Sequence, residues 1–393
     1  MFDFFSKLKK IKGDEEVFKR LYEKKILLDR NEIWEKVLSV IYALATFSKY
    51  WFDQEENKQK ERNVTSKCVP FEHNRVILSS TEENPHGYIN ASYVKFPKIN
   101  RQYIMTSEIA FNEISYYWQM VYEQRVPGIV LLKSLSEIWS INTIYPEKIG
   151  AQLTFGDFTV RCKNLEIHRH YIVRDMELIS LKSKEVHKFR HYHYWFWSDL
   201  ETANLDPMLD FHKVLKENEI LNSPIPTVST SFFNRKQSEI ISSKAAIIQC
   251  YSGNPRSTVF IVMDVLVEMI EKGIKGYYSI EYMLFKLQKQ RMFELKSFND
   301  ISFIYDYMIR FILQRHPELH ALKSHLEHHA ITIPRVDPEI TEDAERFIKT
   351  ERSLVNEKER DRFIGMRQAA ARFQETGLAS VNSTKYRPYI IEN

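Results

Sequence analysis

A cysteine followed six positions later by an arginine stands in "IIQCYSGNPRSTVF", residues 247–260. An apolar run leads into Cys250, turn-forming residues follow it, and a second apolar run comes after Arg256. This order predicts a strand, a tight loop and a helix, which together aim backbone N–H groups and the helix dipole at one point. A thiol at the start of such a loop ionises readily, and a guanidinium fork at its end can hold two phosphate oxygens. The pattern therefore predicts phosphoryl transfer through a phosphocysteine.

Chance produces the same spacing often enough that the pattern needs support elsewhere. With three cysteines, a cysteine and an arginine so spaced occur in roughly one such chain in five. Support comes from "HKFRHYHYWFWSDL", where Asp199 follows Trp197 and Ser198. Cleavage of an aryl phosphate needs an acid that protonates the leaving group, carried on a loop able to close over the substrate. Asp199 fits that role. The alternative, an ordinary exposed turn aspartate, would be preferred if Cys250 were absent.

The elements that must position these residues can be read from apolar periodicity and turn residues. A long Ser/Pro/Thr-rich loop is expected at 222–243, which is either functional or loosely ordered. Short strands are expected within 87–110 and 127–135, and an antiparallel meander over 151–183. The cysteine strand is expected at 244–250. Helices are expected at 33–61, 111–125, 208–218, 257–273, 279–289 and 298–315.

Six stretches, in order, resemble the signature segments of cysteine-dependent, single-domain protein tyrosine phosphatases. They are "VPFEHNRVIL", "GYINASYV", "YYWQMVYEQRVPGIVLL", "HYHYWFWSDL", "IIQCYSGNPRS" and "IEYMLFKLQKQRMFELKSFNDISFIYDYM". The resemblance covers about 31–315. It implies an α/β fold in which helices flank one highly twisted mixed sheet. It also implies that Cys250 is the nucleophile, Arg256 the phosphate clamp, Asp199 the general acid and Ser257 the hydrogen-bond partner of the thiolate.

The chain departs from this family pattern around the nucleophile. The histidine that precedes the family's cysteine is Gln249 here, and we expect less of Cys250 to be thiolate at neutral pH as a result. The glycine before the arginine is Pro255, which has no N–H. One lost phosphate donor costs on the order of 3 kcal/mol of transition-state stabilisation. Thr258 and Ser198 replace a further glycine and the proline of the acid loop.

The segments that recognise the substrate depart further. Where the family has a tyrosine that walls a deep phosphotyrosine slot, this chain has Thr65, and the aspartate that holds the substrate backbone is Lys67. The glutamine that positions water falls at Lys296, and the next polar position is Asp300. A shallower, more basic pocket is expected. The residues expected to bind substrate are Tyr251, Ser252, Gly253, Asn254, Pro255, Thr65, Lys67 and Lys296.

These departures leave two functions open. One is a slow phosphatase acting on phosphorylated proteins, or on a related phosphate monoester such as a phosphoinositide. The other is a pseudophosphatase that binds and sequesters phosphorylated proteins without turnover. The chain is divergent and poor in glycine, and in this it resembles the phosphatases carried by the polydnaviruses of parasitoid wasps. That resemblance implies action on host immune cells, within the host cytoplasm.

Composition bounds the class of protein. The chain has 393 residues, of which 44% are hydrophobic and 27% charged, as is usual for a globular protein. A net charge of +4 suits an anionic substrate but is too weak to indicate nucleic acid. Three unpatterned cysteines favour a reducing compartment, and no apolar run is long enough to span a bilayer. We expect a cytoplasmic protein with no transmembrane segment, no metal and no cofactor.

Three parts are expected along the chain: an N-terminal leader over 1–30, the phosphatase domain over 31–315, and a charged, partly helical C-terminal extension over 316–393. His325, His328 and His329 at helical spacing could ligate a metal. No cysteine or carboxylate completes the set, so a surface role is preferred. Cys68 and Cys162 are expected to be packing residues rather than redox partners of Cys250.

Overall fold

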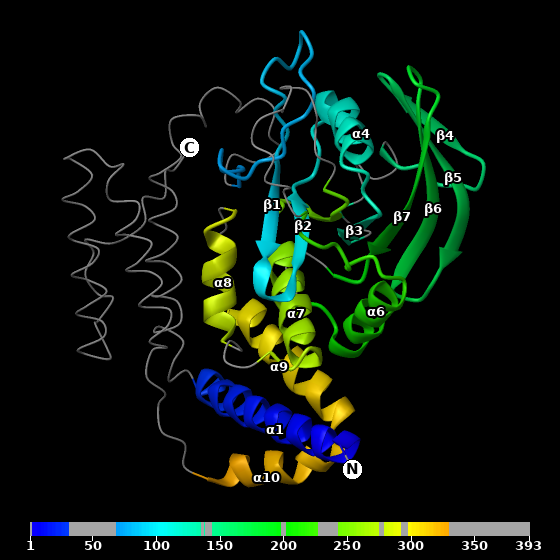
Figure 1. Ribbon diagram of the computed structural model, residues 1–393. Helices are drawn as coiled ribbons and strands as arrows, with labels where there is room; N and C mark the ends of the chain where they lie inside the picture. The colour runs from blue at the N-terminus through cyan, green and yellow to red at the C-terminus, as the bar shows by residue number, and fades with distance from the viewer. Residues whose placement is uncertain are drawn as a thin grey trace, which may run out of the picture. The chain divides into compact units, whose positions relative to one another are not determined.

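One mixed sheet of eight strands organises the larger part of the chain (Figure 1). The computed structural model describes residues 2–30, 68–134, 137, 144–197, 202–226, 243–274, 279–291 and 298–329, with backbone alone for 2–12 and 285. The chain divides into two compact units. The first comprises Met1–Asp53, Gly273–Lys289 and Ile312–Asn393, and the second comprises Gln54–Lys272 and Gln290–Phe311.

The sheet belongs to the second unit and has the order β1-β2-β8-β3-β7-β6-β5-β4. Its centre is parallel, because β8 pairs with β2 and β3, and β3 pairs with β7, in parallel register. The two flanks are antiparallel. The strands are β1 (Ala91–Phe96), β2 (Arg101–Thr106), β3 (Gly128–Leu132), β4 (Gln152–Phe155), β5 (Phe158–Ile167), β6 (Tyr171–Ser180), β7 (Val186–Tyr194) and β8 (Ala246–Cys250).

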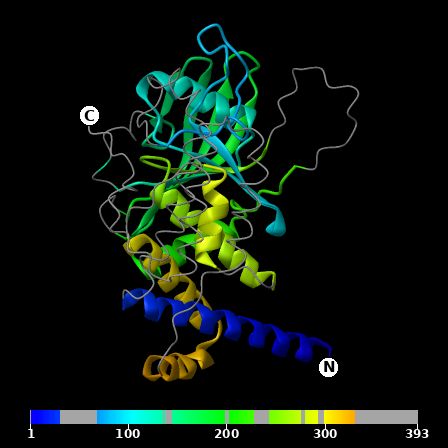
Figure 2. The same ribbon diagram turned by 90° about the vertical axis from the view of Figure 1, so that its left-hand side faces the viewer.

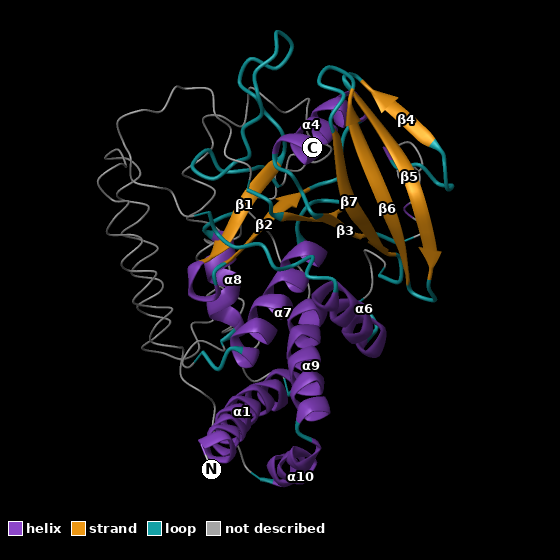
Figure 3. Ribbon diagram, turned by 45° about the vertical axis from the view of Figure 1, so that its right-hand side comes forward, coloured by secondary structure: helices purple, strands orange, loops and turns teal. Residues whose placement is uncertain are grey.

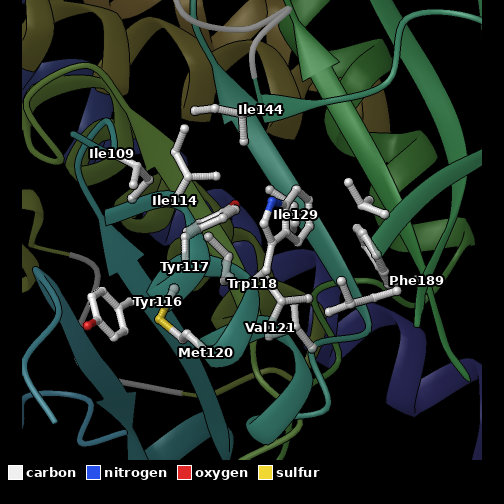
Figure 4. Packing of buried hydrophobic residues seen from close by; sticks show 14 of the residues in the cluster. Ile109, Ile114, Tyr116, Tyr117, Trp118, Met120, Val121, Ile129, Ile144 and Phe189 are labelled. Carbon is white, nitrogen blue, oxygen red and sulfur yellow. The ribbon is translucent and has the colours of Figure 1, made fainter. Parts of the chain in front are cut away.

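Helices cover both faces of this sheet, and Figure 3 shows α4 (Ile114–Glu123) on one side and α6 (Leu205–Glu217) and α7 (Pro255–Glu271) on the other. Helix α9 (Phe298–Arg315) begins in the second unit and ends in the first. Trp118 and neighbouring side chains of α4 pack against strand residues such as Ile129 and Phe189 (Figure 4). The mixed α/β fold with helices flanking one sheet is thus confirmed.

The first unit contains α1 (Phe2–Asp29), α8 (Ile280–Gln288) and α10 (His320–His328). Residues 2–29, expected as a leader, form a helix of 28 residues, which lies beside α10 in Figure 2. The Tyr22 hydroxyl donates to Glu327 Oε1 at 2.5 Å, and Lys24 Nζ lies 3.1 Å from Glu281 Oε2. These contacts join the start of the chain to segments about 260 and 300 residues away.

Most expected elements are found, with shifted boundaries in the meander. The run expected as one strand over 151–162 is a hairpin, which turns at Gly156 with a φ of +54°. Tyr171–Ser180 is one continuous strand, and the whole of β7, quoted above only as a motif, is a strand as well. The expected helix at 33–61 and the middle of the 222–243 loop lie outside the described residues, as does the extension beyond residue 329.

A buried polar network joins α7 to β2, α6 and α9. Asp264 of α7 is fully buried, and its carboxylate accepts from Arg101 Nη1 at 2.7 Å and from the Tyr103 hydroxyl at 2.5 Å. His212 Nε2 lies 2.8 Å from the same carboxylate, while its Nδ1 lies 2.6 Å from the Tyr307 hydroxyl. Burial by itself would raise the pKa of Asp264, but Arg101 and these hydrogen bonds lower it below its ordinary range. A buried carboxylate paired in this way is costly to leave unpartnered.

Acid is expected to unfold this domain partly through His193. Burial lowers the pKa of His193 from its ordinary value near 6.5 to about 4. The unfolded chain therefore takes up a proton near pH 6.5 that the folded protein refuses until about pH 4. The contribution of His193 to the free energy of unfolding is fully present above pH 6.5 and is lost as the pH drops towards 4. At pH 4.5 the loss is about 2 kcal/mol.

The measurement is urea unfolding at pH 7 and pH 4.5 of wild type and His193→Gln. Glutamine preserves a donor for the Lys133 carbonyl, which His193 Nε2 contacts at 2.7 Å. The variant should lose about 2 kcal/mol less than wild type on acidification. In the control variant His86→Gln, at an exposed histidine, the free energy of unfolding should fall on acidification by as much as in wild type. Equal losses in wild type and His193→Gln would contradict the assignment.

Candidate active site

Cys250 is the last residue of β8, at the carboxyl end of the parallel centre of the sheet. Ligand sites in α/β proteins commonly lie at this edge. The chain leaves the strand, makes a four-residue loop and enters α7 at Pro255. The Cys250 side chain is 1% exposed, and its Sγ accepts a hydrogen bond from the Asn254 backbone N–H at 3.1 Å. The expected strand, loop and helix around the cysteine are thus present.

The loop is shaped by Gly253 and by the helix start. Gly253 has a φ of +71°, and a Cβ at this position would lie 2.6 Å from the backbone N of Ser107. Only glycine fits both the angle and the space. Pro255 occupies the first turn of α7, where its missing N–H and fixed φ are tolerated. Proline therefore suits the start of the helix, and it brings no backbone N–H to the loop.

Arg256 is held in one orientation by two acceptors from separate segments. Its guanidinium is 3% exposed, and Nη1 donates to Glu137 Oε2 at 2.9 Å and to the Trp197 carbonyl at 3.0 Å. Glu137 is set by a local turn, because the Ser134 N–H donates to its carboxylate and its own N–H donates to the Ser134 carbonyl. The sequence analysis missed Glu137, because a lone glutamate in "SLSEIWS" follows no pattern.

Gln249 anchors the strand end with a neutral network. Its Nε2 donates to the Ser107 carbonyl at 3.0 Å. Its Oε1 accepts from the hydroxyls of Tyr117 and Tyr145, each at 3.2 Å, and these two hydroxyls lie 2.7 Å apart. Burial raises the pKa of both tyrosines, so they stay protonated donors. The amide therefore orders the residues before Cys250 without contributing a charge.

An ion pair lies beside the cysteine. Lys133 Nζ is 2.7 Å from Glu108 Oε1, and the lysine side chain is 3% exposed. The Glu108 backbone N–H donates to the Tyr251 carbonyl at 2.9 Å, and Lys133 Nζ lies 5.8 Å from the centre of the Tyr251 ring. Both charged residues line a small pocket with Cys250. The remaining residues of its wall are Leu131, Ile144, Tyr145 and Gln249.

Arg291 braces the loop from its buried side. Its side chain is fully buried, and Nε donates to the Gly253 carbonyl at 3.0 Å. Nη1 donates to Ser92 Oγ at 3.0 Å and Nη2 to Asn90 Oδ1 at 2.8 Å. The loop is thus tied to β1 and to the residue before it. The sequence analysis did not single out Arg291, although it lies within the quoted "KQRMF" segment.

The structure brings together some of the expected site residues. Cys250, the loop residues 251–255, Arg256 and Ser257 form one constellation, in which Tyr251 is 40% exposed and Ser257 is fully buried. Ser257 Oγ has no hydrogen-bond partner within the described part of the chain, so its role at the thiolate stays a prediction. Thr65, Lys67, Asp199 and Lys296 lie outside the described residues.

Two features are absent from the described ranges. No group of three or more His, Cys, Asp or Glu side chains in these ranges is arranged to hold a metal ion. None of the helices described is both long and apolar enough to cross a membrane.

Comparison with known proteins connects this geometry to one family. A family model described as protein-tyrosine phosphatase matches residues 57–310. The chain is 34% identical over 372 residues to tyrosine-protein phosphatase non-receptor type eak-6 of Caenorhabditis elegans, which covers 93% of this chain and 91% of that protein. It is 29% identical over 318 residues to protein sdf-9 of the same nematode, covering 77% of this chain and 88% of that protein. To human tyrosine-protein phosphatase non-receptor type 2 it is 26% identical over 258 residues, covering 65% of this chain and 56% of that protein.

Proposed function

The chain belongs to the protein-tyrosine phosphatase family, and from that premise we propose that it hydrolyses phosphotyrosine or a related phosphate monoester through a phosphocysteine at Cys250. The observation that carries the proposal is the Cys250 loop. The sulfur lies at the end of a central strand and accepts from the Asn254 N–H, and the buried guanidinium of Arg256 follows at the helix start.

Four side chains have a part in the proposed reaction. Cys250 attacks phosphorus as the thiolate, with loop N–H groups and the N-terminus of α7 stabilising its charge. Arg256, oriented by Glu137 and the Trp197 carbonyl, binds two phosphate oxygens and stabilises the negative charge that develops on them. Asp199 protonates the leaving phenolate, and Ser257 donates to the thiolate when it departs. Water then cleaves the phosphocysteine.

Slow turnover is part of this proposal. Pro255 removes one N–H donor from the phosphate-binding loop. Gln249 puts a neutral amide where the family has a histidine, which can carry a charge. One missing donor corresponds to a rate roughly a hundredfold lower. Lys67 and Lys296 favour an acidic substrate, such as an acidic phosphoprotein or a phosphoinositide.

The second candidate is a pseudophosphatase that binds phosphorylated proteins and shields them from other enzymes. Pro255, Lys67 and Lys296 favour it. A cytoplasmic location is proposed from the non-receptor type named in the nematode and human relatives. The resemblance to polydnavirus phosphatases, and with it action on host immune cells, stays a prediction on which these relatives do not bear.

The deciding experiment measures turnover and binding on the same wild-type protein. Hydrolysis of p-nitrophenyl phosphate, a phosphotyrosine peptide and a phosphoinositide is followed across pH 5 to 8, and binding of a labelled phosphotyrosine peptide is followed by fluorescence anisotropy. We expect slow turnover of at least one substrate. Tight binding with no turnover of any of them would establish the pseudophosphatase instead. If the protein shows no binding and no turnover, both functions are refuted.

A further inference from the structure

Three segments at one edge of the sheet converge on Tyr251, the residue after the proposed nucleophile. Strand β8 lies between β2 and β3 and runs parallel to both. Parallel strands end at the same edge of a sheet, so the residues just beyond them become neighbours. Glu108 follows β2, Lys133 follows β3 and Tyr251 follows β8. The fold therefore brings together three side chains that are far apart in the sequence.

These three residues form a closed set of contacts. The Glu108 backbone N–H donates to the Tyr251 carbonyl at 2.9 Å. The Glu108 carboxylate accepts from Lys133 Nζ at 2.7 Å, and the same Nζ lies over the Tyr251 ring, 5.8 Å from its centre. An ammonium at about this distance is attracted to the face of an aromatic ring. Tyr251 is thus held both at its backbone and at one face of its ring.

Solvent reaches Tyr251, although the residues around it are buried. Tyr251 is 40% exposed, whereas Cys250 is 1% and Arg256 is 3% exposed. The Lys133 side chain is also 3% exposed, so the accessible part of the tyrosine lies away from the ammonium. Aromatic side chains are common in the walls of ligand sites, where they offer a large contact area. The catalytic loop therefore carries an aromatic surface that is fixed from the inside and open to the outside.

The geometry of phosphoryl transfer brings the ester group of a substrate to this side of the loop. The attacking and leaving atoms lie roughly in line across phosphorus. Because Cys250 is buried behind the phosphate, the ester group points towards solvent. The family's tyrosine that walls the phosphotyrosine slot is Thr65 here, so that position offers no ring. Tyr251, next to the nucleophile in the chain, offers one.

We propose that Tyr251 determines specificity for aryl phosphates, with its open ring packing against the aromatic ring of a phosphotyrosine whose phosphate the loop binds. Lys133 and Glu108 are positioning residues that hold this ring. The inference rests on the proposed function and deepens it, because it places phosphotyrosine proteins above phosphoinositides as ligands. The inositol ring is saturated and has no π-system to stack. An aromatic pair adds to the contact that any apolar group of equal size makes, which corresponds to about fivefold in affinity.

The experiment compares three phosphonates by titration calorimetry: benzylphosphonate, cyclohexylmethylphosphonate and ethylphosphonate. Their carbon–phosphorus bond is not hydrolysed, so binding is measured without turnover. We expect wild type to bind the benzyl compound about fivefold more tightly than the cyclohexylmethyl compound. Tyr251→Phe keeps the ring and should keep this preference. Tyr251→Leu should lose the preference but bind ethylphosphonate as wild type does, because the loop N–H groups and Arg256 are unchanged. Phe111→Leu, at an aromatic residue that is 83% exposed, is the control and should behave as wild type.

Two outcomes would overturn the inference and leave the proposed function standing: a wild type that binds all three phosphonates without preferring the benzyl compound, or a Tyr251→Leu variant that retains the preference. If Tyr251→Leu does not fold, as judged by circular dichroism, nuclear Overhauser contacts decide. The benzylphosphonate ring should then contact a tyrosine resonance of wild type that Tyr251→Phe removes, and the absence of that contact refutes the inference. If wild type binds none of the phosphonates, the proposed function fails, and the inference fails with it.

Discussion

Cys250→Ser is expected to lower hydrolysis of p-nitrophenyl phosphate by about four orders of magnitude or more, while phosphate binding is retained. A serine hydroxyl is not ionised at neutral pH, so the loop N–H groups and the helix dipole have no anion to activate. The cradle itself survives, because serine is nearly isosteric and its oxygen can accept from the Asn254 N–H as the sulfur does at 3.1 Å. Binding and catalysis therefore separate at this position.

The measurement is kcat and KM across pH 5 to 8, together with phosphotyrosine-peptide affinity from anisotropy. Cys162→Ser, at the buried thiol of β5, is the matched control and should leave kcat within a few fold of wild type. Turnover that persists in Cys250→Ser would exclude the phosphocysteine route. A loss of peptide affinity equal to the loss of rate would mean that the loop had collapsed rather than lost its nucleophile.

Arg256→Lys is expected to lower kcat/KM by about three orders of magnitude and peptide affinity by about two. Lysine carries one point charge in place of a planar fork, so it cannot bind two phosphate oxygens while it faces both the Glu137 carboxylate and the Trp197 carbonyl. In contrast to the change at Cys250, this one lowers binding as well as rate. It is therefore informative for either candidate function.

Arg190→Lys provides the control, because Arg190 pairs with Asp175 at 3.0 Å where both side chains are partly exposed. That variant should behave as wild type in rate and affinity. Thermal unfolding of Arg256→Lys separates a local from a global effect. Unchanged peptide affinity in a folded Arg256→Lys would show that the phosphate is not bound at this loop.

The sequence predicted the parts of the site that depend on local order. An apolar run, turn residues and a second apolar run predicted the loop between Cys250 and Arg256, because each property is carried by adjacent residues. The order of the strands in the sheet and the partners of Arg256 could not be read in this way. Glu137 and Trp197 meet Arg256 across 119 and 59 residues, and only the fold brings them together.

The tertiary structure clarified the surroundings of two residues. Gln249 could be recognised as a departure, but its network with Tyr117 and Tyr145 joins residues 132 and 104 positions apart. Cys68 was expected to be a packing residue, and it is indeed buried. Its contact with the Gly253 carbonyl, 185 residues away, is what relates it to the catalytic loop. Neither the hydrogen bonds of Gln249 nor the contact of Cys68 can be predicted from residue type alone.

The position of β8 in the sheet has a consequence for biosynthesis. Among the strands of the described residues it is the last in chain order, yet it lies between β2 and β3 and pairs with both. While the ribosome is still synthesising the segment before residue 246, these two strands have no partner on their facing edges, and such edges invite pairing with other chains. The arrival of β8 fills the gap between β2 and β3, so the nascent chain depends on the strand that carries Cys250 to become resistant to aggregation.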